Sequence, residues 1–163
     1  MPERRPESTR IRGVVACTLL VLAAGCTGSV EIDSAHVDAS TRAACARFLE
    51  AVPEKVSGEV QRKTDPPDAL GAAWGDPPIV VTCGVQMPDD FDAFSPCEEV
   101  NGVGWYIPDE DVADPTSDVT MTTIGFEPIV RIELPGEYRP PADVLVEIGA
   151  AVRTTLTRTK RCV

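Results

Sequence analysis

The chain has very little histidine and few basic residues. Its 163 residues contain one His, and 15 Lys and Arg stand against 26 Asp and Glu, giving a formal net charge of −11. A single imidazole disfavours metal centres that use several His ligands. The acidic excess disfavours nucleic acid as a partner, because phosphate binding needs a basic face. We therefore expect neither a nucleic-acid-binding protein nor a metalloenzyme with several histidines.

Long hydrophobic runs are also missing, since no stretch of eighteen apolar residues occurs. The uncharged stretch from Gly13 to Ala24 is the nearest approach, and four arginines precede it. Twelve residues of helix span only about 18 Å, well short of the roughly 30 Å hydrocarbon core of a bilayer. A basic region followed by a short apolar region is typical of a secretory signal rather than a permanent transmembrane helix.

The signal ends in a pattern that resembles the bacterial lipobox, in which small residues precede a Cys that is acylated and becomes the new N-terminus. The residues are Leu22-Ala23-Ala24-Gly25-Cys26, with the leucine one position further from the cysteine than usual. We expect residues 1–25 to be a lipoprotein signal peptide. Acylated Cys26 would then bind membrane lipid on the outer face of the cytoplasmic membrane, because two or three acyl chains give stable anchoring. The alternative is an ordinary cleavage site that releases a soluble secreted protein.

Four further cysteines lie in the exported part, namely Cys45, Cys83, Cys97 and Cys162. An oxidising compartment favours two disulfides among them. Their spacings of 38, 14 and 65 residues lack the close pairs of a four-cysteine metal site, so no metal is predicted. Spacing alone does not select among three connectivities. We favour Cys83–Cys97, which closes a short loop, together with Cys45–Cys162, which joins the two ends of the domain.

The exported part reads as a short linker followed by one domain. Residues 26–39 are small and polar and predict a tether, and residues 40–163 predict a single α+β domain. Helices are expected at about 40–52, capped by Ser40 or Thr41, and at about 142–157. Strands are expected at 79–83, 103–107, 119–124 and 129–134, with a weaker edge strand at 56–63. These elements predict a mostly antiparallel sheet of four to five strands, with two helices packed on one face and two disulfides.

Two segments carry a family resemblance. They are Trp74-Gly75-Asp76-Pro77-Pro78, followed by a β-branched strand, and Gly102-Val103-Gly104-Trp105. With these segments the chain resembles an actinobacterial family of exported proteins and lipoproteins, the domain of unknown function 3515 (DUF3515), over roughly Cys45 to Cys162. That family has no assigned activity. The resemblance therefore implies an envelope location and supplies no catalytic residue and no cofactor.

The acidic residues concentrate in the middle of the chain. Residues 64–130 hold 14 acids and no Lys, Arg or His, with clusters at 89–92, 98–99 and 109–111. Solvated acidic loops are the simplest interpretation. A Ca²⁺ site is an alternative, although the glycine and glutamate of an EF-hand loop are missing. Carboxylates paired for glycoside hydrolysis are another alternative. His36 falls in the predicted tether, and no G-x-S-x-G motif occurs, so no hydrolase triad is expected.

Aromatic residues make up 5% of the chain, and three residues near Pro-rich loops suggest a binding patch: Trp74, Tyr106 and Pro108. Core packing is the competing interpretation for each of them. Trp105 and Tyr106 should face opposite sides of their strand. The overall expectation is a membrane-anchored lipoprotein that acts, without enzymatic activity, as a binding or interaction module for an envelope protein or cell-wall ligand. An envelope hydrolase that uses carboxylates of the 89–111 region is the alternative.

Overall fold

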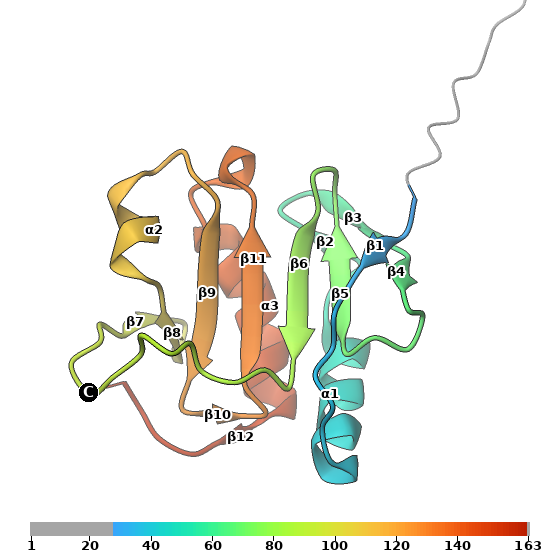
Figure 1. Ribbon diagram of the computed structural model, residues 1–163, viewed down its shortest axis with the longest axis horizontal. Helices are drawn as coiled ribbons and strands as arrows, with labels where there is room; N and C mark the ends of the chain where they lie inside the picture. The colour runs from blue at the N-terminus through green and yellow to red at the C-terminus, as the bar shows by residue number, and fades with distance from the viewer. Residues whose placement is uncertain (1–27, 163) are drawn as a thin grey trace, which may run out of the picture.

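The computed structural model describes residues 28–162, which fold around one antiparallel sheet of eight strands (Figure 1). The strand order across the sheet is β2-β3-β5-β6-β11-β9-β8-β7. The strands are β2 (Lys55–Val56), β3 (Glu59–Arg62), β5 (Gly71–Trp74), β6 (Ile79–Cys83), β7 (Glu98–Val100), β8 (Val103–Tyr106), β9 (Val119–Ile124) and β11 (Val130–Leu134). The helices are α1 (Ala39–Ala51), α2 (Asp109–Ala113) and α3 (Ala142–Thr155), with a 3₁₀ turn, η1 (Gly136–Tyr138). Two small pairs lie outside the sheet, β1 (Val30–Glu31) with β4 (Thr64–Asp65) and β10 (Phe126–Glu127) with β12 (Thr157–Arg158).

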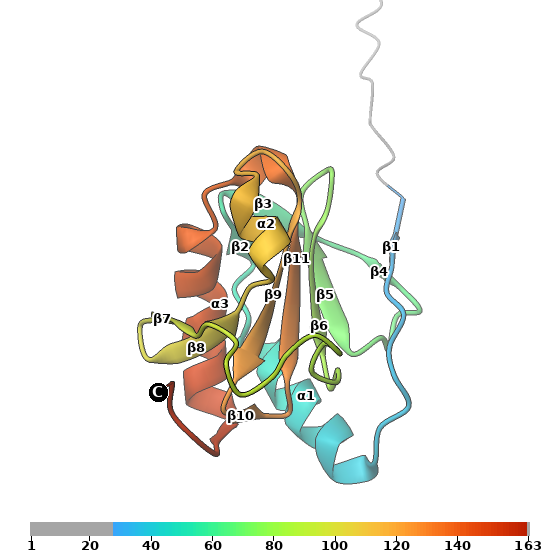
Figure 2. The ribbon, with the colours of Figure 1, turned by 60° about the vertical axis from the view of Figure 1, so that its left-hand side comes forward.

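The two long helices, α1 and α3, cover the same face of this sheet (Figure 2). Alternation along β11 explains the arrangement, because Val130, Ile132 and Leu134 are buried towards the helices while Arg131 and Glu133 point to the opposite face. We call that opposite face the outer face. The predicted α+β class, the antiparallel sheet and the two disulfides are confirmed. The sheet has eight strands rather than four to five, and a third, short helix is present.

The predicted stripe of α3 forms its buried side. Leu145, Ile148, Val152 and Leu156 are all at most 8% exposed and pack against the sheet. Within residues 28–162, no helix has the length and apolarity needed to cross a membrane.

The cap of α1 differs from the prediction. Asp38, rather than Ser40 or Thr41, is the N-cap residue, and its Oδ1 accepts hydrogen bonds from the backbone N–H groups of Ser40 (2.8 Å) and Thr41 (3.0 Å). The hydroxyls of Ser40 and Thr41 also donate to this carboxylate. The bond from the Ser40 hydroxyl, together with the other three, favours the charged form, so the pKa of Asp38 lies well below its usual range. The two residues predicted as caps are donors to the true cap.

The sequence prediction missed β5 and β7. β5 has the sequence Gly-Ala-Ala-Trp, which lacks β-branched residues, and β7 begins with two glutamates. Both strands are held by their neighbours. β5 pairs with β6 and β3, and β7 pairs with β8 at the edge of the sheet.

The expected tether lies on the domain. From Val30 onwards the segment runs over the outer face of β5, and Val30 and Ile32 are buried against Ala69 and Ala73. β1 pairs in parallel with β4, and the Leu70 N–H donates to Ser34 Oγ at 2.7 Å. The two apolar residues alternate with acidic residues. Their side chains therefore point to the same side of the segment and pack against the outer face of the sheet. The domain therefore begins before residue 40.

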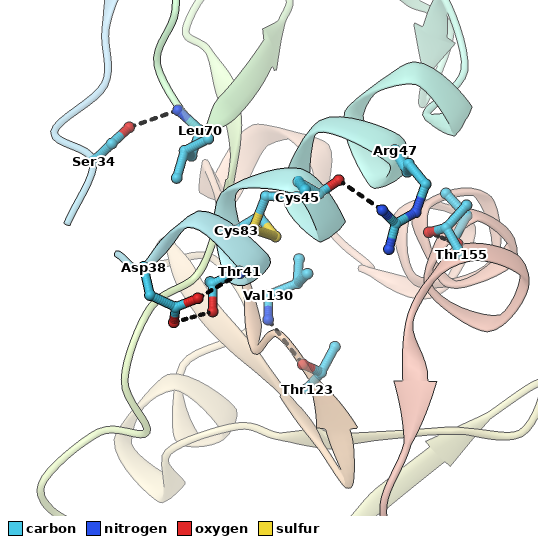
Figure 3. The surroundings of a disulfide bond; sticks show 12 residues. Ser34, Asp38, Thr41, Cys45, Arg47, Leu70, Cys83, Thr123, Val130 and Thr155 are labelled. Carbon is cyan, nitrogen blue, oxygen red and sulfur yellow. Dashed lines mark hydrogen bonds between the residues drawn. A yellow bond between two sulfur atoms is a disulfide. The ribbon is translucent and has the colours of Figure 1, made fainter. Parts of the chain in front are cut away.

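The disulfides also correct the prediction. Cys45 pairs with Cys83 (Figure 3), and Cys97 pairs with Cys162. The favoured bond between Cys83 and Cys97 is excluded by the strand order, because β6 and β7 are four positions apart in the sheet, a distance of about 19 Å. A disulfide needs its Cα atoms within about 7 Å. Cys83 faces α1 instead and is buried there with Cys45.

Candidate functional site

The loop of residues 84–97 crosses the outer face of the sheet on its way from β6 to β7 (Figure 1, Figure 2). It is attached at its end by the Cys97–Cys162 disulfide. In its middle, the Phe91 ring packs edge-on against Tyr106 with ring centroids 5.2 Å apart, and the Lys160 ammonium lies 5.9 Å from the Phe91 ring centre. An aromatic pair of this geometry adds to the stabilisation from area burial alone. The loop is thereby held over β8 and the C-terminal residues.

Between this loop and the start of α2 lies a hollow of about 320 Å³, which we call the acidic hollow. Four carboxylates contribute to its lining, from Asp90, Asp92, Asp109 and Glu110. The remaining lining residues are Phe94, Ser95, Pro96 and Tyr106. Among residues 28–162, the ion pairs join Arg62 to Asp76 and Arg131 to Glu133, so none of the four carboxylates forms one. The hollow therefore carries uncompensated negative charge.

Phe94 stands at the tip of the loop with 95% of its surface exposed. The turn that presents it is closed by local hydrogen bonds. The Phe94 N–H donates to Asp92 Oδ1 at 2.7 Å, and the Asp92 N–H donates to Ser95 Oγ at 2.8 Å. Asp and Ser side chains commonly stabilise turns in this way. A large aromatic ring is thus displayed to solvent on an ordered turn, at the rim of an acidic hollow.

Tyr106 forms part of the base of the acidic hollow. Its hydroxyl donates to Asp90 Oδ2 at 2.7 Å, and its side chain is 5% exposed because Phe91 covers it. The hydrogen bond to Asp90, followed by burial and by the charges of Asp90, Glu110 and Asp109, raises the pKa of Tyr106 to about 12.

The phenol of Tyr106 should therefore stay protonated until about pH 12. The ultraviolet absorbance of tyrosinate measures this ionisation in a Tyr138→Phe background. Asp90→Ala should move the transition towards the ordinary value of 10.0, while Asp89→Ala, the matched control, should leave it in place. The folded state holds this proton more tightly than the unfolded state, so stability should fall as pH rises from about 10 to about 12. A Tyr106 transition near 10 in the folded protein would contradict the contact with Asp90.

The predicted binding patch of Trp74, Tyr106 and Pro108 is not assembled. Trp74 is fully buried, and its indole N–H donates to the Pro53 carbonyl at 3.0 Å. Pro108 is half-buried, and its carbonyl accepts from the first turn of α2. Of the three, only Tyr106 reaches the acidic hollow. The competing interpretation, core packing, holds for Trp74, and Trp105 and Tyr106 do face opposite sides of the sheet as predicted.

The acids of the 89–111 region separate into different surroundings. Glu98 and Glu99 lie on the edge strand β7, and the Asp111 carboxylate accepts the Thr120 N–H at 2.8 Å. Asp89 lines a different hollow, together with the first residues of the loop. Within residues 28–162, no group of three His, Cys, Asp or Glu side chains is arranged to hold a metal ion. Cys26, the predicted site of lipid attachment, lies outside the described residues.

Sequence reasoning missed Phe94, the most exposed large hydrophobic residue of this surface. The available signal was an aromatic residue inside an acidic, turn-forming stretch.

No curated protein and no solved structure matches the chain. A family model does match it, over residues 10–161, and its description is "Protein of unknown function (DUF3515)". With nearly its whole length matched by that model, the chain belongs to the DUF3515 family.

Proposed function

We propose that the chain is an exported lipoprotein, anchored by acylated Cys26 to the outer face of the cytoplasmic membrane, and that its domain is a non-enzymatic binding module of the cell envelope. The basic and apolar N-terminal pattern with its lipobox supports the anchoring. The two disulfides support export, because such bonds persist in oxidising compartments.

The observation that carries the binding function is the nearly complete exposure of Phe94 beside four carboxylates that form no ion pair within the described part of the chain. A large aromatic ring in water costs free energy that contact with a partner regains. Aromatic residues are also enriched where partners bind. The carboxylates favour a partner with Lys or Arg side chains, because opposite charges steer association. We therefore propose that the partner is an envelope protein that presents a basic segment with at least one apolar side chain.

The anchoring is tested by Cys26→Ser. This variant should lose its lipid label and leave the membrane fraction, whereas the parent should be labelled by a radioactive or clickable fatty acid and sediment with membranes. A parent that is released without label would show instead a soluble secreted protein.

The binding surface is tested by placing a photo-crosslinking amino acid at position 94 in the full-length lipoprotein in intact cells. Position 60 is the matched control, because Val60 is also exposed (60%) but lies on β3, far across the sheet. A discrete adduct should form from position 94 and not from position 60, and mass spectrometry should place it on a basic segment of the partner. Equal labelling from both positions would contradict the proposal.

The contribution of charge is tested in the same cells by combining Asp92→Asn, Asp109→Asn and Glu110→Gln. These substitutions should weaken the adduct at least tenfold, and added salt should do the same to the parent. A variant that loses the cellular phenotype of the parent while its adduct persists would favour the hydrolase alternative, because the carboxylates would then act without the partner.

A further inference from the structure

Arg131 occupies an unusual position on the outer face, separate from the acidic hollow. It lies near the middle of β11, between β6 and β9, and its register partners are Thr82 and Thr122. Residues directly opposite on neighbouring strands share a face and lie about 5 Å apart. The three polar side chains therefore form a short row across the centre of the sheet. Thr82 and Thr122 are only 5% and 1% exposed.

This row is short of hydrogen-bond partners. Within residues 28–162, buried Nε of Arg131 and buried Oγ1 of Thr122 have no partner. The contact of Arg131 Nε with Glu133 Oε1 measures 3.9 Å, which is beyond hydrogen-bond range. Buried polar groups without partners cost free energy, and most are satisfied in native proteins. The Arg131 side chain as a whole is 37% exposed, so a ligand can reach its terminal N–H groups, and a carboxylate binds such groups with two parallel bonds.

Two chain segments turn this position into a hollow of about 390 Å³, which we call the Arg131 hollow. One is the N-terminal segment that crosses β5, and the other is the start of the 84–97 loop (Figure 1). Besides Arg131, the charged lining residues are Asp33 on the first segment and Asp89 on the second. Apolar lining comes mainly from Val85, Met87 and Pro88. This volume lies within the range of small-molecule sites, which combine apolar walls with a few placed charges.

The signs of these charges select the class of ligand. A simple anion would meet Arg131 but also two exposed carboxylates, and a simple cation would meet the carboxylates but also the guanidinium. We propose that the Arg131 hollow binds a small zwitterion of the amino-acid or short-peptide class. Its carboxylate lies on Arg131 and its ammonium group lies between Asp33 and Asp89. This site is lined by residues 85–89 of the loop and the acidic hollow by residues 90–96, and the site does not depend on the proposed partner there.

The test is a titration of the intact lipoprotein in detergent with glycine, alanine, glutamate, lysine and dialanine, followed by calorimetry and by the Nε–H resonance of Arg131. At least one of these zwitterions should saturate with a dissociation constant below about 1 mM, and the Arg131 resonance should shift with the same curve. Its N-acetyl derivative, which lacks the ammonium group, and its amide, which lacks the carboxylate, should each bind at least tenfold more weakly. Inorganic phosphate should not compete.

Variants locate the site. Arg131→Gln should abolish binding and Asp89→Asn should weaken it at least tenfold, while Arg153→Gln, an exposed arginine on α3, should leave it unchanged. The thermal midpoint of each variant shows whether the domain is still folded. The proposal is overturned if none of the zwitterions binds with a dissociation constant below about 1 mM. It is also overturned if the N-acetyl derivative binds as well as its parent, or if folded Arg131→Gln binds as the parent does.

Discussion

Replacing Cys45 and Cys83 together with alanine should lower the free energy of unfolding by about 5 kcal/mol. In the chain-entropy model, a disulfide closing 38 residues contributes about 4 kcal/mol by restricting the unfolded chain. Both sulfur atoms are also buried, at 0% and 1% exposure, between α1 and the end of β6. Removing them leaves a small cavity in the core, which adds on the order of 1 kcal/mol. The thermal midpoint should fall by roughly 15 °C.

The matched control is the double variant Cys97→Ala/Cys162→Ala. Its loop of 65 residues predicts a similar entropic loss of about 4 kcal/mol, but this disulfide is half-buried and lies outside the core cluster. Urea unfolding measures the free energy of unfolding of both double variants. The dependence of that free energy on urea concentration shows whether the denatured state has changed. If the outer pair costs as much as the inner pair or more, burial of the Cys45–Cys83 bond adds nothing, and the cavity argument is wrong.

The elements that the sequence predicts well are those in which local pattern and tertiary burial agree. Ile132 and Leu134 alternate with charged residues, and Ile148 and Val152 follow the period of a helix. Each pattern therefore predicts which side of its element is buried. The hairpin of β9 and β11 follows from the short connection at Gly125. In these segments the free energy of burial depends on residues that are close in sequence.

The elements that escape prediction depend on neighbours that are distant in sequence. β5 is formed by Ala72 and Ala73, which have little preference for strands but fit beneath α1 and the N-terminal segment. The disulfide pairing depends on strand order, which no spacing encodes. The tether prediction failed because two apolar residues, Val30 and Ile32, are too few to show a period in the sequence. The apolar surface that they cover is formed by residues distant in the chain.

The candidate sites show the same division. The alternation of β11 predicts that Arg131 faces away from the core, but not that two loops fold over it. The acidic loops are visible as composition. Which carboxylates share a hollow with Phe94 is decided by the Cys97–Cys162 bond and the Phe91–Tyr106 contact, since these fix the path of the loop.

Gly104→Ala should displace or open the Cys97–Cys162 disulfide and lower the free energy of unfolding by roughly 3 kcal/mol. A Cβ atom at this position would lie 2.6 Å from Cys162 Sγ and 2.9 Å from Cys97 Sγ, closer than real Cβ contacts. β8 is hydrogen-bonded to β7 on one side and to β9 on the other, so its backbone cannot move away from the sulfur atoms. The bond must then move or stay open, with loss of up to the about 4 kcal/mol that it contributes. Thiol titration of the unfolded protein and urea unfolding measure the two outcomes.

The decisive comparison places Gly104→Ala in the Cys97→Ala/Cys162→Ala background. There the two sulfur atoms are gone, so the same substitution should cost less than about 1 kcal/mol, and the coupling between the sites should be at least about 2 kcal/mol. Gly149→Ala is the control for a glycine with room, because its nearest contact would be Val103 Cγ2 at 3.5 Å and a helix favours alanine by up to about 1 kcal/mol. Equal costs for Gly104→Ala in both backgrounds would show that the strand, and not the disulfide, requires glycine at this position. A large coupling would instead explain why a glycine stands next to Trp105: it leaves the space through which the C-terminal residues are joined to the loop that carries Phe94.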